Sequence, residues 1–214
     1  MNSKTLKSLI AGPAGALEIA IDLPLGAPRG VAVIAHPHPL FGGTLDNKVV
    51  HTLARAFVQS GWTAVRFNFR GVGASAGSHD QGRGELDDML AAVEHAAPAG
   101  EGAVPLALAG FSFGASVTTH AFERLRLARR IDKLVLIGIG VSRAPAAPVD
   151  ASAHGITLVV HGEQDDTVLL SDVMDWARPQ ALPVTVVPGV EHFFHGQLTL
   201  LKNLVTRHLA VPVN

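Results

Sequence analysis

Gly110-Phe-Ser-Phe-Gly114 is the stretch of this sequence that decides its fold. It follows an apolar run at 104–109 that predicts a buried strand, and it precedes a segment at 115–126 that predicts a helix. A serine on so sharp a turn is held in a strained backbone conformation that lifts its hydroxyl clear of the sheet. The flanking glycines let strand and helix approach closely. Ser112 is therefore a candidate nucleophile, and the alternative is an ordinary structural turn.

Composition narrows the class of protein. The chain has 214 residues, of which 48% are hydrophobic, enough for one large core and a single domain spanning 1–214. A net charge of -1 offers no basic field for nucleic acid or for a membrane, so a small molecule is the expected partner. The chain has no cysteine, which excludes disulfides and thiol catalysis and leaves an oxygen as nucleophile. A cytoplasmic location is consistent with this composition.

The elements on either side of the serine turn alternate between strand and helix. Segments 5–10 and 16–23, separated by Gly12, Pro13 and Gly15, predict an opening hairpin. Further strands are predicted at 31–35, 63–69, 104–109, 133–139, 156–160 and 184–187, and helices at 48–59, 85–96, 115–126, 171–177 and 198–209. Residues 141–154, rich in alanine and proline, predict a loop. This alternation predicts a mostly parallel sheet covered by helices on both faces, with no insertion long enough to form a lid.

A serine hydroxyl needs a base within hydrogen-bond reach and a third group that orients the base. In a parallel sheet such partners belong on loops at the carboxyl ends of strands. Acidic residues follow the strand at 156–160, and a histidine follows the strand at 184–187. The chain thus presents a serine, an acid and a histidine in that order, which is typical of one class of hydrolases.

Four further segments carry a resemblance to a known family. They are His-Pro-His-Pro-Leu-Phe-Gly-Gly-Thr from His36, Arg-Phe-Asn-Phe-Arg-Gly-Val-Gly-Ala-Ser from Arg66, His-Gly-Glu-Gln-Asp-Asp-Thr-Val from His161 and Pro-Gly-Val-Glu-His-Phe-Phe-His from Pro188. Together with the serine turn, they resemble a small serine α/β-hydrolase without a cap domain, of the esterase and dienelactone-hydrolase-like kind. The resemblance covers nearly the whole chain and implies an α/β-hydrolase fold opened by an antiparallel hairpin.

The resemblance also assigns roles. The family pattern G-x-x-D-x-x-V fits Gly162, Asp165 and Val168, so it implies that Asp165 is the acid, with Asp166 as the alternative. His192 matches the family's histidine and is the expected base. His195, three residues on and close to the start of the final predicted helix, is the alternative, and that position suits a surface residue equally well.

Two N–H donors are needed to stabilise the oxyanion of an acyl-transfer intermediate. One is expected to be the amide of Phe113, which follows the nucleophile at a helix N-terminus. The second is expected from the loop after the strand at 31–35, where Pro37 and Pro39 have no N–H. Leu40 is the first choice and His38 the second. Similar hydrolases carry His-Gly where this chain has His-Pro.

We therefore predict a cofactor-independent serine hydrolase that cleaves carboxylic esters of short or medium acyl chain, acting as a monomer or homodimer. The acyl group is expected in an open cleft bordered by Phe41, Phe111, Phe113, Phe194 and Val141. Thioester, lactone or amide hydrolysis by the same residues is the alternative, followed by a non-catalytic binding protein. The histidines match no common metal-ligand spacing, so no metal is expected.

Overall fold

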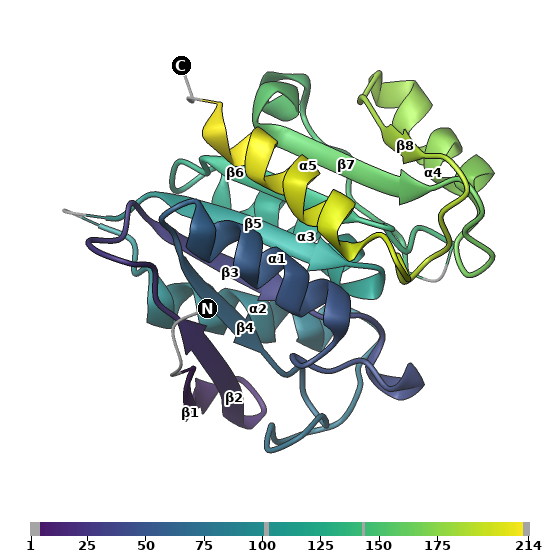
Figure 1. Cartoon of the computed structure of the whole chain (residues 1–214). Helices are drawn as coiled ribbons and strands as arrows, with labels where there is room; N and C mark the ends of the chain where they lie inside the picture. Colours follow the sequence, from purple (N-terminus) through teal and green to yellow (C-terminus); the bar gives the residue numbers. More distant parts are fainter. Residues whose placement is uncertain (1–4, 101–102, 143, 212–214) are drawn as a thin grey trace.

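An eight-stranded sheet runs through the molecule, with helices packed on both faces (Figure 1). The computed structural model describes residues 5–100, 103–142 and 144–211. The strands are β1 Leu6–Gly12, β2 Gly15–Asp22, β3 Val31–Ala35, β4 Thr63–Phe67, β5 Leu106–Phe111, β6 Lys133–Ile137, β7 Thr157–Gly162 and β8 Thr185–Val187. The α-helices are α1 Lys48–Gln59, α2 Arg83–Ala96, α3 Phe113–Leu125, α4 Leu170–Ala177 and α5 Leu198–Ala210. Short 3-10 turns span Pro39–Phe41, Ala151–Ile156 and Arg178–Gln180.

The strand order is β1-β2-β4-β3-β5-β6-β7-β8. Strands β1 and β2 form an antiparallel hairpin, and β2 pairs antiparallel with β4. Every pair from β4 to β8 is parallel. This topology confirms the predicted α/β-hydrolase fold with its opening hairpin and mostly parallel sheet.

The central strands are buried because helices cover both sides of the sheet. Strand β3, with the sequence Val-Ala-Val-Ile-Ala, is buried along its whole length, as expected for a parallel strand between two helical layers. Helices α1 and α5 lie side by side on one face, and their apolar residues share one core cluster (Figure 1). Helices α2 and α3 pack on the other face with a second cluster.

The bounds of several elements differ from the prediction by a few residues. Strand β5 begins at Leu106 because Pro105 has no N–H to give to the sheet. Strand β4 ends at Phe67. Asn68 N still donates to Glu18 O of β2, but Glu18 N donates to Ser75 Oγ and Phe69 N to His36 Nε2, so the pairing goes no further. The predicted loop at 141–154 leads into the 3-10 turn Ala151–Ile156, and Arg143 lies outside the described residues.

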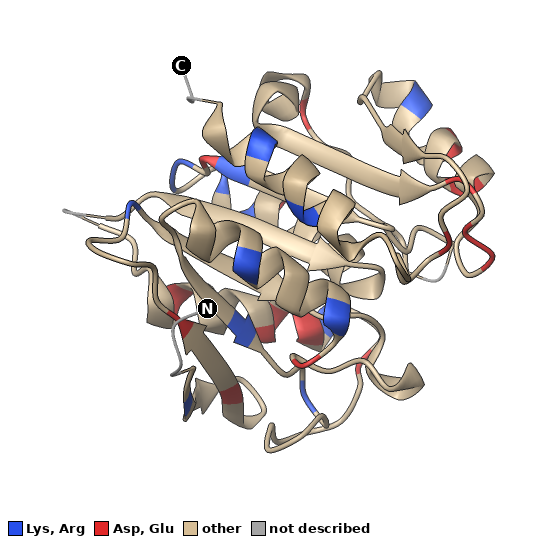
Figure 2. Cartoon of the chain, viewed as in Figure 1, with Lys and Arg blue, Asp and Glu red and all other residues tan. Residues whose placement is uncertain are grey.

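Basic and acidic side chains are interspersed over the described chain (Figure 2). Among the described residues, no helix has the length and apolar character needed to cross a bilayer.

Candidate active site

Ser112 occupies the turn between β5 and α3. Its φ of 55° lies in the left-handed region, which a non-glycine residue adopts only under constraint. The constraint comes from β6, because Ser112 N donates to Ile137 O at 2.9 Å. A Cβ on Gly110 would lie 2.5 Å from Gly114 O, and one on Gly114 would overlap the carbonyl oxygen of His36. The sharp strand-to-helix turn therefore depends on both glycines.

The structure brings three predicted residues into one line. His192 Nε2 lies 3.0 Å from Ser112 Oγ, and His192 Nδ1 lies 2.6 Å from Asp165 Oδ2. Because an ionised carboxylate only accepts hydrogen bonds, Nδ1 carries the proton and Nε2 accepts from the serine hydroxyl. The residues come from loops after β5, β7 and β8, so the carboxyl ends of three parallel strands deliver them to one place.

Asp165 sits in an environment that keeps its carboxylate ionised. Burial alone would raise the pKa of Asp165, but hydrogen bonds from His192 and the Val168 N–H, together with neighbouring imidazoles, hold it below its ordinary value. Its other oxygen, Oδ1, accepts from Thr167 N at 3.0 Å and Val168 N at 2.8 Å. These two bonds fix the carboxylate orientation and leave Oδ2 for His192.

His161 lies behind this carboxylate. It is fully buried, donates from Nε2 to Val168 O at 2.9 Å, and lies 3.4 Å from Asp165 Oδ2. Burial lowers the pKa of His161, and His192 adds to that effect. The imidazole is therefore kept neutral, and its single N–H is bonded to Val168 O, the carbonyl of a residue whose own N–H donates to Asp165.

The two alternative residues lie elsewhere. Asp166 is exposed, and its Oδ1 accepts from Thr167 Oγ1 at 3.4 Å. His195 is exposed and pairs with Glu191, with Nδ1 and Oε1 3.1 Å apart. Neither side chain reaches the line from Ser112 to Asp165.

Phe113 is the first residue of α3 and lines the pocket beside Ser112. The amide of Leu40 is already engaged, because it donates to His38 Nδ1 at 3.2 Å across the 3-10 turn. Leu40 itself is 69% exposed and does not line the pocket, whereas His38 does. Of the two expected donors, His38 therefore lines the pocket and Leu40 does not.

A pocket of about 120 Å³ opens beside Ser112. Its lining residues are Pro37, His38, Phe41, Gly42, Gly43, Asn47, Ser112, Phe113, Gly140, Thr167, His192 and Phe193. Phe41 was expected there and is 71% exposed at the rim.

Three expected pocket residues are not in this lining. Phe111 is fully buried beneath His192, with ring centroids 4.9 Å apart, because it is the last residue of β5 and faces the α1 and α5 side of the sheet. Phe194 is 1% exposed and belongs to the same core cluster. Val141 is partly buried against the core on the opposite face. Their aromatic or apolar character serves packing, and Phe193 supplies the pocket surface instead.

Some lining residues were not anticipated. Asn47 is the N-cap of α1, where its Oδ1 accepts from Val49 N and Val50 N. An Asn directly before a helical pattern signals a cap, but that signal does not tell which cavity the residue borders. Thr167 and Phe193 each lie within two residues of a predicted site residue, so proximity in sequence is the only signal that points to them.

Within the described part of the chain, no group of three or more His, Cys, Asp or Glu side chains is arranged to hold a metal ion. His36 illustrates why the histidine-rich loop does not form such a group. Its Nδ1–H donates to Pro37 O at 2.6 Å, and its Nε2 accepts from Phe69 N at 3.0 Å. Both ring nitrogens are thus used by the backbone.

Residues 26–163 match the family model described as serine aminopeptidase, S33. An α/β serine hydrolase without lid from Xanthomonas campestris superposes with a TM-score of 0.81 at 33% identity, covering 100% of this chain and 98% of that one. An α/β serine hydrolase homologue from Coxiella burnetii gives a TM-score of 0.81 at 38% identity, covering 98% and 99%. An uncharacterized protein of Rickettsia prowazekii is 29% identical over 207 residues, covering 92% of this chain and 86% of the relative.

Proposed function

We propose that this chain, which belongs to the serine α/β-hydrolases without a lid, hydrolyses carboxylic esters of short or medium acyl chain. The observation that carries the proposal is the unbroken line of hydrogen bonds from Ser112 Oγ through His192 to Asp165, at 3.0 and 2.6 Å. A hydroxyl, an imidazole and a carboxylate at these distances form the arrangement that activates a serine for acyl transfer.

The first half of the reaction transfers the acyl group to the protein. As Ser112 Oγ attacks the ester carbonyl carbon, His192 Nε2 takes the hydroxyl proton, and Asp165 stabilises the resulting imidazolium. The tetrahedral intermediate collapses, the bond to the leaving oxygen breaks, and His192 returns the proton to the departing alcohol. The product of this half is an ester on Ser112.

The second half releases the acid. Water enters the open pocket, His192 removes one of its protons, and the hydroxide adds to the acyl carbon. The second intermediate collapses with the proton returning to Ser112 Oγ. We assign the two oxyanion donors to the amides of Phe113 and His38, because both residues line the pocket and the Leu40 amide is engaged.

The size of the pocket argues for small acyl groups. At about 120 Å³ it is slightly smaller than a cavity of about 150 Å³ that holds benzene. Phe41 and Phe193 give it an apolar wall, and a long lipid chain would have to run over the protein surface.

A series of p-nitrophenyl esters from acetate to palmitate tests this proposal. We expect kcat/KM to be highest for acetate to hexanoate and to fall for longer chains. A maximum at palmitate would overturn the proposed chain length, and no turnover of any ester would overturn the proposed bond class.

The description of the matching family names an aminopeptidase, so amide cleavage is the second candidate. An aminopeptidase must bind the positively charged α-amino group of its substrate, usually with a carboxylate. None of the described residues that line the pocket is an Asp or Glu, which favours the ester. Competition between an amino-acid p-nitroanilide and p-nitrophenyl butyrate separates the two candidates.

A further inference from the structure

One wall of the pocket is a segment without regular secondary structure, residues 42–47. Gly42, Gly43 and Asn47 of this segment line the pocket. Leu45, within this segment, is 1% exposed and is not among the residues that line the pocket. The position of Leu45 therefore decides how closely the wall approaches Ser112.

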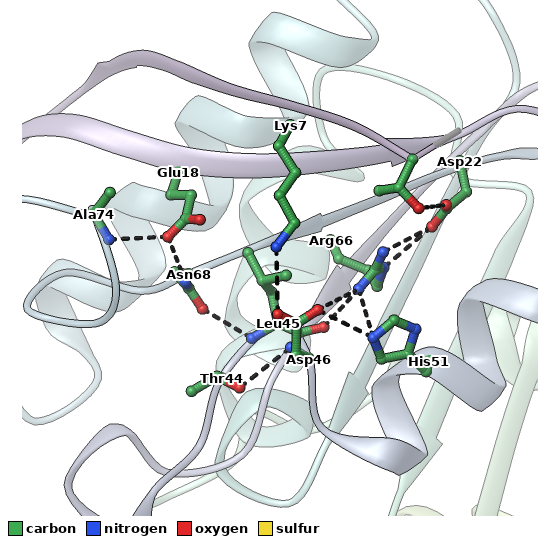
Figure 3. Close-up of polar contacts among 11 residues, drawn as sticks. Lys7, Glu18, Asp22, Thr44, Leu45, Asp46, His51, Arg66, Asn68 and Ala74 are labelled. Atoms are coloured by element: carbon green, nitrogen blue, oxygen red, sulfur yellow. Dashed lines mark hydrogen bonds and ion pairs between the residues drawn. The ribbon is translucent and has the colours of Figure 1, made fainter. Parts of the chain in front are cut away.

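Both backbone polar atoms of Leu45 are held by side chains from one short stretch of chain at the end of β4. Leu45 N donates to Asn68 Oδ1 at 2.8 Å, and Leu45 O accepts from Arg66 Nη1 at 2.9 Å (Figure 3). Asn68 is 4% exposed and Arg66 is 1% exposed. These bonds are shielded from water, so no solvent molecule replaces them easily when they break.

Each holding side chain is in turn oriented by a carboxylate of β2. Asn68 Nδ2 donates to Glu18 Oε2 at 2.7 Å, which also accepts from Ala74 N. Arg66 donates from Nε and Nη2 to Asp22 Oδ2 at 3.2 and 3.0 Å. Both carboxylates belong to β2, the second strand of the antiparallel hairpin (Figure 3).

The same guanidinium reaches the far end of the wall. Arg66 Nη1 lies 3.3 Å from Asp46 Oδ1 and 3.1 Å from His51 Nε2 in α1. The wall is thus tied at Leu45 and Asp46 to β4 and, through it, to β2. Its other end is tied by Gly43 N, which donates to His38 O at 3.1 Å.

We propose that Asn68 and Arg66 are positioning residues which, oriented by Glu18 and Asp22, hold the pocket wall 42–47 beside Ser112 and thereby set substrate affinity and acyl-chain selectivity. The claim about affinity and acyl-chain selectivity rests on the proposed ester hydrolysis. The claim that these residues hold the wall in place does not. It gives the opening hairpin a role in the site although no hairpin residue lines the pocket.

Asn68→Leu tests the inference, because leucine has similar size and makes neither bond. We expect backbone hydrogen exchange in 42–47, measured by mass spectrometry, to become at least tenfold faster. KM for p-nitrophenyl butyrate should rise about tenfold while kcat changes less than threefold, and the fall in kcat/KM from hexanoate to longer esters should become shallower. Gln180→Leu is the matched control, since Gln180 also joins two backbone groups, Val149 N and Trp176 O, but contributes nothing to the pocket.

Glu18 provides a second pair of variants that leaves the wall and Asn68 intact. Glu18→Ala removes the acceptor that orients Asn68. It should therefore show part of the faster exchange in 42–47 and part of the rise in KM expected for Asn68→Leu. Glu18→Gln keeps an oxygen that accepts from Asn68, so it should restore exchange and KM to near wild-type values.

If hydrogen exchange in 42–47 is unchanged in Asn68→Leu and Glu18→Ala, these side chains do not hold the pocket wall, and the inference is overturned. Faster exchange with unchanged KM and selectivity would overturn their role in substrate binding, as would equal effects in Gln180→Leu. If the wild-type protein hydrolyses no ester, the proposed function fails, and the exchange data together with labelling rates of short and long alkyl fluorophosphonates still decide the inference.

Discussion

At the scale of single residues, the two adjacent aspartates after β7 have opposite surroundings. Asp165 is buried and bonded to His192, whereas Asp166 is exposed. Replacing Asp165 by Asn should reduce kcat by roughly 10⁴-fold, because the amide no longer fixes the tautomer of His192 or stabilises its charged form. Asp166→Asn should leave kcat within twofold of wild type. Steady-state kinetics on p-nitrophenyl butyrate checks both, and a comparable loss in the two variants would refute the assignment.

The neighbouring phenylalanines offer the same kind of comparison. Phe193 is 41% exposed at the pocket and Phe194 is 1% exposed in the core. Phe194→Ala should lower the free energy of unfolding by about 3–5 kcal/mol because it leaves a cavity. Phe193→Ala should change unfolding little and raise KM for butyrate esters. Urea titrations and kinetics on both variants measure this, and the reverse pattern would contradict the placement of the two rings.

What the sequence predicts at this scale depends on the kind of residue. Ser112, Asp165 and His192 come together as expected because chemistry restricts each to one residue type at the end of a strand. Phe111 and Phe194 lie in the core rather than in the pocket lining, because a phenylalanine suits a core and a pocket equally. The bond of Leu40 N to His38 Nδ1 depends on local turn geometry. Burial and backbone direction decide where these residues lie, and neither can be predicted from the type of a single residue.

At the scale of elements, the turn between β5 and α3 leaves no room for side chains at its two glycines. Gly114→Ala would force a Cβ against the His36 carbonyl, so we expect a loss of about 1–3 kcal/mol in the free energy of unfolding. Gly155→Ala is the control, because nothing lies within 4 Å of its Cβ position, and it should stay within about 0.5 kcal/mol. Chemical denaturation of both variants provides the measurement; equal stabilities would show that the turn tolerates a side chain.

The elements themselves were largely predictable. Helix α1 has the predicted bounds, since an Asn cap precedes a clear apolar period and Gly61 follows it closely. Strand ends were less predictable, as at Phe67, where the bonds from Glu18 N to Ser75 Oγ and from Phe69 N to His36 Nε2 end the pairing between strands. Those partners are distant in sequence, so local propensity cannot reveal them.

At the scale of the whole molecule, the buried histidines make stability depend on pH. Burial lowers the pKa of His36 to about 4 from 6.5, and burial likewise lowers that of His208 to about 4. Between about pH 6.5 and pH 4, these histidines are therefore protonated in the unfolded chain and neutral in the folded chain. The stability that depends on keeping these histidines neutral is fully present above about pH 6.5 and is lost as pH falls toward 4. For His36 alone, the free energy of unfolding decreases by about 3 kcal/mol.

Urea unfolding at several pH values between 7.5 and 4 measures this dependence. His36→Gln keeps an acceptor for Phe69 N but does not titrate, so its stability should change less over the same range. An equally steep decline in this variant would assign the effect to other groups.

The central claim for the molecule is that Ser112 carries the acyl group during turnover. The most direct measurement is the mass of the Ser112 peptide after brief mixing with p-nitrophenyl butyrate and an acid quench. We predict that this peptide alone gains the mass of one butyryl group, and that Ser112→Ala shows neither the adduct nor turnover. Sustained ester hydrolysis by Ser112→Ala, or an adduct on a different residue, would contradict the account.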